Sequence, residues 1–384
     1  MKLTDNSFIA ETTGHLSINF TSEASYLPIT SYNYFRLRNF YKKNNEALKR
    51  EALIFSLTGI GAVALFLLSL FIGAVDIPVS TVLEILCGSD DANASWRFIV
   101  IESRLPQALT AVLAGGSLAV CGLLMQALFR NPLADPSILG VSSGAGLGVA
   151  LVMLFFGGGI AVGGLSVIGF VAILFAAFAG ALVVTLLMLL VSQIVRGNST
   201  LLIVGIMVGY LSASATMLLN YFSSADGVRS YMLWGMGNFS SVSPDRLVLF
   251  ASVALCCVAV SVLLVKPLNV LVLGRQYAEN LGVNTRLLRN VILLVTGMLT
   301  AVTTAFCGPI AFIGLAVPHV SRLLLHTDDY RLLLPLTIAV GAFVALLCNV
   351  ASAFAPDGGV LPVNALTPLV GVPVILYIML RKQI

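Results

Sequence analysis

The chain has 384 residues, of which 58% are hydrophobic and only 10% are charged, and its mean hydropathy is +1.00. Soluble domains carry about 25% charged residues, so most of this chain's surface must face lipid. This composition excludes a coiled coil, a disordered protein and a nucleic-acid binder, and the net charge of +4 matters only through where Lys and Arg lie relative to the membrane. The predicted fold class is an all-α integral membrane protein.

The N-terminal region differs from the rest of the chain. Residues 1–50 contain no apolar stretch of the kind found in a cleavable signal peptide. Residues 1–34 are polar and show no periodicity, which is typical of a disordered tail. We expect residues 1–50 to form a cytoplasmic N-terminal tail and residues 51–384 to form one membrane domain, whose first span also serves as the targeting signal.

A transmembrane helix needs about 20 mostly apolar residues, and about ten stretches after the tail satisfy or approach this length. The clear ones are 53–75, 105–128, 138–156, 165–191, 200–222, 246–265, 290–307 and 331–352. The other two are 312–325, which is short and contains Pro318, and 362–380, which contains Pro368 and Pro373. We therefore predict about ten transmembrane helices.

The positive charges predict the orientation of these spans. With the N-terminus inside and ten alternating spans, the Lys and Arg residues left outside are Arg97, Arg104, Arg229 and Arg246, out of 21 in all. Cytoplasmic connections carry the excess of Lys and Arg in membrane proteins, so both termini are expected in the cytoplasm. The long connections are then 76–104 and 223–245 outside and 266–289 inside, with a shorter outside turn at 356–359.

The sequence shows no catalytic or metal-binding pattern. Five of the six cysteines lie in apolar runs and Cys87 lies alone in a loop, so no disulfide or metal framework is expected. No P-loop, zinc-protease motif or Ser-His-Asp arrangement is present. We predict that the chain is not an enzyme and holds no cofactor or metal. The centres of the spans also lack carboxylates, which argues against a proton-driven carrier and for a passive path powered by a partner.

Two features inside the spans have a structural and a functional interpretation. Many glycines lie in spans, for example Gly115, Gly116 and Gly122, and small residues let helices approach closely in lipid. His319 and Arg322 share one face of a helix after Pro318. Ionisable residues in a membrane are functional candidates, but we favour the simpler interpretation that Arg322 extends toward the interface and His319 caps the helix end.

One long stretch carries a family resemblance. Residues 104–146 read RLPQALTAVLAGGSLAVCGLLMQALFRNPLADPSILGVSSGAG, and this stretch resembles the permease family of ABC importers for iron-siderophores, haem and cobalamin, the type II importers. Three further stretches agree: 275–289 (RQYAENLGVNTRLLR), 308–325 (GPIAFIGLAVPHVSRLLL) and 361–377 (LPVNALTPLVGVPVILY). The similarity covers roughly residues 53–384.

The resemblance implies a fold, partners and a cellular location. Such a subunit has ten helices with an inverted repeat, and two subunits, here expected to be a homodimer, surround a central translocation path in the bacterial inner membrane. The implied partners are two ATPase subunits, which hydrolyse the ATP, and a periplasmic or lipid-anchored substrate-binding protein. The implied cargo is an iron chelate (siderophore or haem) or cobalamin, and no residue selects among them. The alternatives are a proton-coupled secondary transporter of a small organic solute and a membrane scaffold.

The resemblance also implies sites. A short polar helix ended by Gly282 can insert into a groove of a soluble partner, and in the family this stretch couples to the ATPase; it comprises Arg275, Gln276, Glu279, Asn280, Leu281, Gly282, Val283 and Asn284. The cytoplasmic gate is expected at Asn131, Leu133, Asn198 and Ser199. Binding-protein docking is expected at Arg104 and Arg97, while Gln107 and Ala353 stand where the family has further arginines. Met207, Ser212, Ser214 and Met217 are candidates for lining the path.

Overall fold

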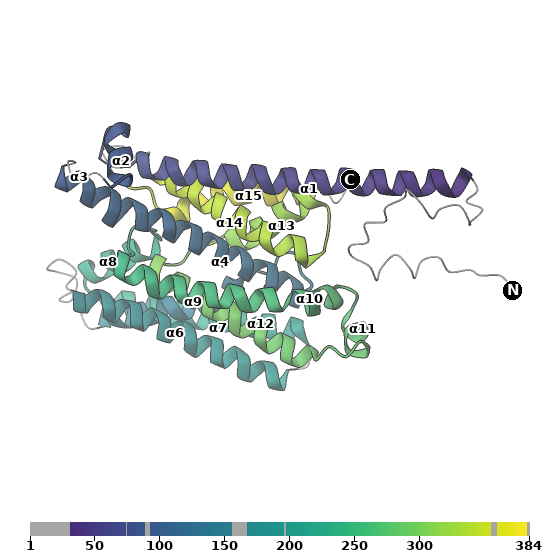
Figure 1. The fold of residues 1–384 in the computed structure, drawn as a ribbon. Helices are drawn as coiled ribbons and strands as arrows, with labels where there is room; N and C mark the ends of the chain where they lie inside the picture. Colours follow the sequence, from purple (N-terminus) through teal and green to yellow (C-terminus); the bar gives the residue numbers. More distant parts are fainter. Residues whose placement is uncertain are drawn as a thin grey trace. The chain divides into compact units, whose positions relative to one another are not determined.

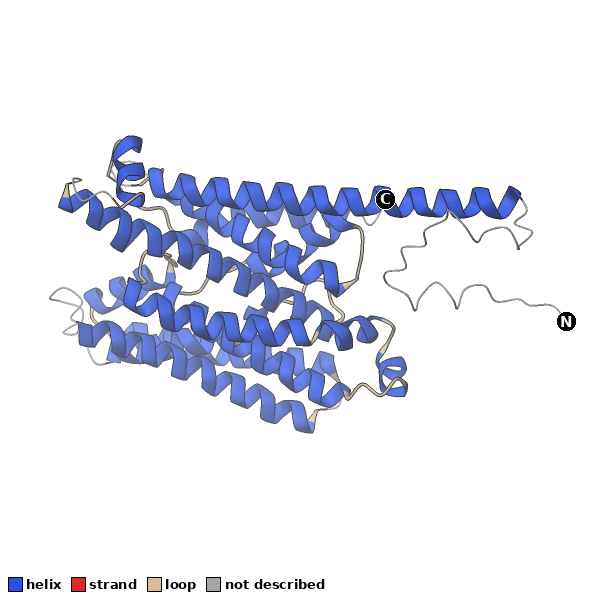
Figure 2. Ribbon diagram, in the orientation of Figure 1, coloured by secondary structure: helices blue, strands red, loops and turns tan. Residues whose placement is uncertain are grey.

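In the computed structural model, the described residues are 31–73, 75–88, 93–155, 167–195, 197–354 and 359–381, and all regular structure within them is helical (Figures 1 and 2). The chain divides into two compact units, Met1–Ala52 and Leu53–Ile384. Arg196, Lys382 and most of the predicted turn 356–359 lie outside the described residues. The long helices, in chain order, are α1 (Ser31–Phe71), α4 (Leu105–Phe129), α6 (Val167–Ile194), α7 (Asn198–Phe222), α9 (Pro244–Leu263), α12 (Thr285–Cys307), α14 (Tyr330–Ser352) and α15 (Val363–Arg381).

Shorter helices lie between the long ones. They are α2 (Val79–Leu86), α3 (Ala94–Phe98), the π-helical turn η2 (Ile99–Arg104), the 3-10 turn η3 (Pro136–Leu139), α5 (Val141–Ala150), the π-helical turn η4 (Leu151–Phe155), α8 (Ala225–Gly235), α10 (Val265–Val272), α11 (Arg275–Asn280) and α13 (Ile313–Leu325). The sequence predicts connections where α2, α3, α8 and α10 lie, because helices this short do not produce the long apolar stretch that marks a span.

The start of α1 lies within the predicted N-terminal tail. Residues 31–50 are helical and continue without a break into the first apolar span. No Pro or Gly occurs between Ser31 and Thr58, and the strongest helix breakers are therefore missing from this stretch. The part of the predicted tail that precedes Ser31 lies outside the described residues.

Each of the ten predicted stretches overlaps a helix, but the helices differ in their capacity to cross a membrane. Seven are long and apolar enough, by length and composition, within the described part of the chain. Three others are apolar but shorter: Val141–Leu154, Ile313–Leu325 and Val363–Tyr377. The prediction of multiple spans is confirmed for the seven long helices.

Helix α4 lies at the centre of unit Leu53–Ile384 and packs against α12, α13 and α14. Glycines allow the close contacts: a Cβ on Gly115 would lie 2.3 Å from the Gly341 carbonyl oxygen, and a Cβ on Gly122 would lie 1.7 Å from that of Gly314. Any larger residue would separate these backbones. The predicted role of the span glycines in helix packing is thus confirmed at α4.

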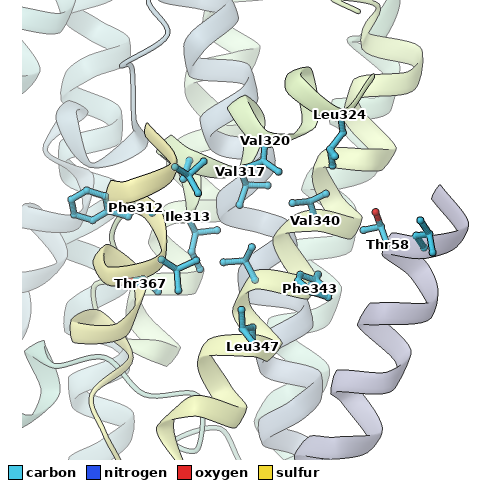
Figure 3. Close-up of a pocket in the computed structure, with 16 residues that line it drawn as sticks. Thr58, Phe312, Ile313, Val317, Val320, Leu324, Val340, Phe343, Leu347 and Thr367 are labelled. Atoms are coloured by element: carbon cyan, nitrogen blue, oxygen red, sulfur yellow. The ribbon is translucent and has the colours of Figure 1, made fainter. Parts of the chain in front are cut away.

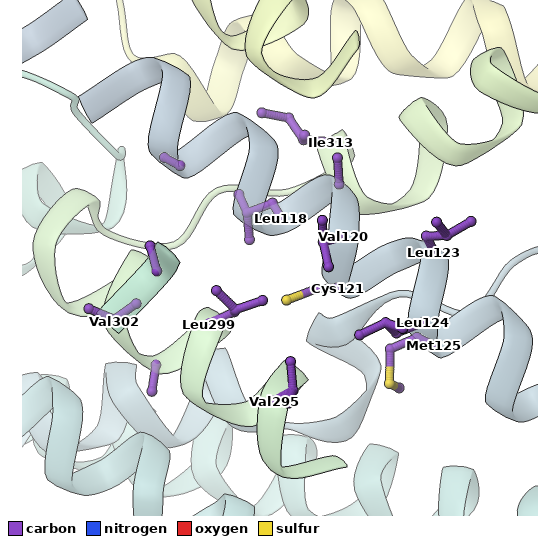
Figure 4. Packing of buried hydrophobic residues seen from close by; sticks show 14 of the residues in the cluster. Leu118, Val120, Cys121, Leu123, Leu124, Met125, Val295, Leu299, Val302 and Ile313 are labelled. Atoms are coloured by element: carbon purple, nitrogen blue, oxygen red, sulfur yellow. The ribbon is translucent and has the colours of Figure 1, made fainter. Parts of the chain in front are cut away.

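Apolar side chains fill the space around these contacts. Figure 4 shows Leu118 and Cys121 of α4 beside Leu299 of α12, and these three side chains belong to one buried cluster. The Cys121 thiol lies 3.6 Å from the Thr296 carbonyl oxygen. Cys121 is therefore a small core residue.

Candidate functional site

The segment from α10 to the start of α12 forms an exposed projection with a defined shape. Gly274 and Gly282 have positive φ angles of 126° and 85°, a conformation that glycine adopts readily, and they bracket the short helix α11. Ala278 is fully buried and anchors α11. Tyr277 and Leu281 are 60% and 59% exposed. The projection thus exposes an aromatic side chain on α11 and an apolar side chain at its C-terminal end.

Polar contacts stabilise this projection. Arg275 Nε donates to Glu279 Oε1 at 2.9 Å, and Thr285 Oγ1 donates to the same oxygen at 2.6 Å. These hydrogen bonds, from Thr285 first and then Arg275, hold the pKa of the Glu279 carboxyl below its ordinary value of 4.5. Asn284 caps α12, since its Oδ1 accepts from the Leu287 amide at 3.0 Å. The structure therefore brings the predicted coupling residues into one turn-helix-turn unit.

The turn after α4 contains the first predicted gate pair. Arg130 ends α4 in the left-handed conformation with φ 49°. Asn131 Oδ1 then accepts from the Leu133 amide at 2.9 Å, and Leu133 itself is 43% exposed. Asp135 caps the turn η3 by accepting from the Ser137 amide at 2.9 Å. Burial raises the pKa of the Asp135 carboxyl, although the hydrogen bonds from Ser137 act in the opposite direction.

The second predicted gate pair lies at the same end of the bundle. Asn198, at the start of α7, donates from Nδ2 to the Leu128 carbonyl oxygen at 2.6 Å. Leu128 is in the last turn of α4, three residues before Asn131. The structure thus links the start of α7 to the turn that carries Asn131 and Leu133, and Ser199 is exposed beside this contact.

Two arginines that the sequence analysis did not select hold this end of the bundle together. Arg130 Nη2 donates to the Leu271 carbonyl oxygen at 2.7 Å and so joins α4 to α10. Arg289 of α12 donates from its two Nη atoms to the carbonyl oxygens of Val195 and Ser192, where α6 ends. Because the acceptors are backbone groups of distant segments, no spacing in the sequence reveals these pairs.

His319 and Arg322 have structural contacts that differ from those expected. His319 does not cap a helix end: its Nδ1 lies 2.8 Å from the Leu315 carbonyl oxygen inside α13, and α13 ends at His326, which has a left-handed conformation. Arg322 Nη1 donates to Gln126 Oε1 at 2.6 Å and ties α13 to α4. Both residues therefore have structural contacts, as expected. His319 contacts a carbonyl group within its own helix instead of capping the helix end, and Arg322 binds a side chain of α4.

The two predicted docking arginines have different surroundings. Arg104 is only 5% exposed, and its guanidinium donates to the carbonyl oxygens of Leu70 and Phe71 at 2.9 Å and to that of Val75. It therefore closes the end of α1 and is not presented to solvent, in contrast to the expectation. Arg97, at the end of α3, is exposed. At the position of a family arginine, Gln107 donates to Asn349 Oδ1 at 2.8 Å and joins α4 to α14.

The candidate path residues lie on α7, whose surface is largely uncovered. Met207 and Met217 are 60% and 76% exposed, and Ser214 is also exposed. Ser212 is buried, and its hydroxyl donates to the Val208 carbonyl oxygen. Beside this surface, a pocket with polar groups from α5, α7 and α8 includes Ser142, Thr216, Asn220 and Tyr231.

A separate cavity of about 380 Å³ lies between α13, α14, α15 and residues 57 and 58 of α1. Figure 3 shows Val317, Val340 and Phe343 among its lining side chains, which are nearly all apolar. The only polar side chains in this lining are those of Thr58 and Thr367, so the surface offers no charged group that could orient a polar substrate. Among the described residues, no cluster of His, Cys, Asp and Glu is arranged to hold a metal ion.

Comparison with known proteins shows which family the chain resembles. The model of the FecCD transport family matches residues 61–381. The permease protein BtuC of the vitamin B12 import system from Citrobacter koseri is 34% identical over 313 residues, which cover 78% of this chain and 90% of that protein. BtuC from Salmonella paratyphi A is 35% identical over 298 residues, covering 76% of this chain and 87% of that protein.

A solved structure agrees with these relatives. It is described as an inward-facing conformation of a proposed metal-chelate type ABC transporter, and it superposes with a TM-score of 0.71 at 30% identity, covering 87% of this chain and 99% of that chain. The match extends over nearly the whole helical unit. The chain therefore belongs to the FecCD transport family, the permeases of type II ABC importers, and is a multi-pass inner-membrane protein of a family whose members are not themselves enzymes.

Proposed function

We propose that this chain is the membrane-spanning subunit of an ATP-driven importer that takes up an iron chelate or cobalamin delivered by a binding protein. The observation that carries the proposal is the projection around α11 in a chain of this family: it exposes Tyr277 on α11 and Leu281 at the end of α11, and the helix is held by Ala278 and by the Glu279 contacts. A soluble ATPase that clamps α11 could transmit its closure directly to α10 and α12. ATP hydrolysis belongs to that separate subunit.

The proposed assembly contains two copies of this chain with ten spans each, two ATPases and one binding protein. The support for a second copy is the exposed apolar face of α7, on which Tyr210, Leu211 and Leu218 are each more than 60% exposed. One chain alone would leave a path along α7 open to lipid on one side. Both termini and α11 then lie in the cytoplasm, with residues 1–50 preceding the permease domain at residues 51–384.

The gate and docking roles follow from the same orientation. Asn131, Leu133, Asn198 and Ser199 lie at the α11 end of the bundle and are proposed to close the path there; the Asn198 contact with Leu128 supports joint movement of the two segments. Docking of the binding protein is assigned to Arg97, because Arg104 is occupied with the end of α1. Arg104 is proposed to position this docking face.

Uptake into proteoliposomes tests the proposal. The full complex would be reconstituted with its binding protein and ATP and offered radiolabelled cyanocobalamin, a ferric siderophore or haem in separate reactions. We expect uptake of one of these cargoes that requires ATP and persists in the presence of a proton uncoupler. Uptake without ATP that collapses with the uncoupler would establish the secondary transporter instead, and no uptake of any cargo would favour a scaffold.

A pair of variants tests whether the ATPase acts on this chain through α11. Leu281→Glu places a charge on the exposed apolar residue that caps the C-terminal end of α11 and is expected to abolish ATP-dependent uptake while leaving the fold intact. Leu273→Glu, at the residue that caps the end of α10 and is 64% exposed, serves as the matched control. Equal loss in both variants would mean that α11 has no special role.

A further inference from the structure

A cavity of about 290 Å³ lies where α4, α10, α11 and α12 meet Gly197 and Asn198 at the start of α7. Four arginines line it: Arg130, Arg275, Arg286 and Arg289. Neither the gate nor the coupling role explains why positive charge gathers at this point. The volume is several times the ~30 Å³ that one water molecule occupies in the liquid, so the cavity has room for a small hydrated anion.

The positive charge of this cavity is only partly balanced. Among the described residues that line it, none is an Asp or Glu. The nearby carboxylate of Glu279 pairs with Arg275, at a half-exposed position. Arg130, Arg286 and Arg289 form no ion pair within 4.0 Å among the described residues, although Arg286 is close enough to Glu279 to help lower the pKa of that carboxyl. Like charges that share one cavity repel one another, and an anion in the cavity would relieve this repulsion.

Arg289 provides a second, independent observation. It is 8% exposed, and although its two Nη atoms donate to the end of α6, its buried Nε has no hydrogen-bond partner. Buried cations are usually paired, because an unpaired charge in a poorly solvated site is unfavourable. This cation is therefore incompletely satisfied by the described residues of the chain.

The remaining walls of the cavity indicate what kind of anion fits. Thr285 and Arg286, the first two residues of the 23-residue helix α12, lie in its lining, so the positive end of the helix dipole adds to the field. Leu128, Phe129 and Leu288, which belong to the ends of apolar spans, form another part. Guanidinium groups match phosphate oxygens geometrically, and basic pockets between membrane helices at the cytoplasmic boundary bind lipid headgroups.

We infer that this cavity is a binding site for a phosphate group, supplied by an anionic lipid headgroup or by free phosphate, that links α4, α6 and α12 beside the coupling helix. The bound group would neutralise Arg130, Arg286 and Arg289 together. It would thereby hold the starts and ends of these helices at fixed positions near α11. The inference concerns the chain alone and is independent of cargo and ATPase.

The test uses the purified full chain and two probes. In the first arm, inorganic phosphate is titrated against the chain in phosphatidylcholine nanodiscs at constant ionic strength, and thermal unfolding is followed by intrinsic fluorescence, because a ligand of the folded state raises the melting temperature. In the second arm, nanodiscs with and without phosphatidylglycerol are compared, and native mass spectrometry counts the retained anionic lipid.

Arg286→Gln removes one exposed arginine of the cavity and should fold normally, and Arg331→Gln removes an exposed arginine of α14 that does not line it. We expect stabilisation or lipid retention in at least one arm, weakened roughly tenfold by Arg286→Gln and unchanged by Arg331→Gln. A response in the first arm identifies free phosphate, and a response confined to the second identifies the lipid headgroup.

Two results would overturn the inference. The first is no response to either probe in the unaltered chain; if Arg286→Gln then also weakens binding of the purified ATPase, the cavity receives an acidic side chain of the partner instead. The second is an equal loss in both arginine variants, which would mean nonspecific attraction.

Discussion

Helices α4 and α7 have the same length of 25 residues, and their most apolar stretches have the same mean hydropathy of 2.0, yet they occupy opposite environments. In α4, 83% of the residues in this apolar stretch are buried, whereas in α7 only 22% are buried. Hydropathy measures whether a helix can enter a membrane, and it does not reveal whether protein or lipid will surround it. The difference lies in the residues at the contacts.

On α4, the contact residues are glycines and alanines that face the backbone of neighbouring helices, as at Gly115 and Gly122. On α7, the corresponding surface carries Met, Tyr and Leu, including Met217 and Tyr221, which are 76% and 82% exposed. Helix α4 is therefore packed inside the subunit, and the uncovered face of α7 is the surface that the proposed path and second copy would use. Four predictions test this contrast.

The largest loss of stability is expected when a glycine at a close helix contact is replaced by alanine. Gly122→Ala places a Cβ 1.7 Å from the Gly314 carbonyl oxygen, so α4 and α13 must separate, and we expect a loss of more than about 3 kcal/mol of stability. Gly209→Ala on α7 meets its nearest atom at 3.7 Å, which is an ordinary contact. Thermal unfolding in detergent should show a much lower melting temperature for the first variant only; equal melting temperatures would contradict the contrast.

The next largest difference in stability is expected between alanine variants of one leucine on each helix. Leu123 on α4 is fully buried and Leu218 on α7 is 63% exposed. Leu123→Ala leaves a cavity and should cost about 3 kcal/mol, whereas Leu218→Ala should change the stability of the separate subunit by less than about 0.5 kcal/mol. Denaturant titration of the monomeric chain measures both, and similar losses would mean that α7 is as buried as α4.

A smaller effect is expected at the polar contact of α4 with α13. Gln126→Leu removes the acceptor at 2.6 Å from Arg322 Nη1 and should destabilise the chain by about 2 kcal/mol, because the arginine donor is left without this partner. Gln126→Glu keeps an acceptor and should lose less. If the two variants melt at the same temperature, the hydrogen bond makes no net contribution.

The smallest effect is a pH-dependent change in the mobility of the exposed helix α11. The pKa of Glu279 is lowered by its hydrogen bonds to Thr285 and Arg275, so these contacts are fully present above the ordinary pKa of 4.5 and are lost as the pH falls below it through the lowered folded-state value. A spin label on a cysteine at Leu281 should become more mobile over that range. In a Glu279→Gln background the pH dependence should disappear; if it persists, another group controls α11.

Much of the fold could be predicted from the sequence because long apolar stretches are local signals. Each of the ten predicted stretches overlaps a helix, and a short helix ended by Gly282 was expected where α11 lies. The helical start of α1 was missed because its residues are polar, and polarity alone does not prevent a helix.

The site could be predicted only where its contacts are local. Asn131, Asp135 and Asn284 accept hydrogen bonds from backbone amides two or three residues further along the chain. The contacts of Arg104 with the end of α1, of Asn198 with Leu128 and of Arg289 with the end of α6 join residues 29 to 97 positions apart. Their acceptors are backbone carbonyl groups, which every residue carries, so no side-chain pattern marks them.

The central claim is that an ATPase drives this chain through α11. The most direct measurement is purification of the chain from its native membrane in mild detergent, with mass spectrometry of its partners and an ATPase assay on the purified material. We predict a nucleotide-binding subunit in equal amount, with its ATPase activity lost when Gln276 to Gly282 is scrambled. Recovery of the chain without any ATPase, combined with uptake that collapses on addition of an uncoupler, would contradict the account.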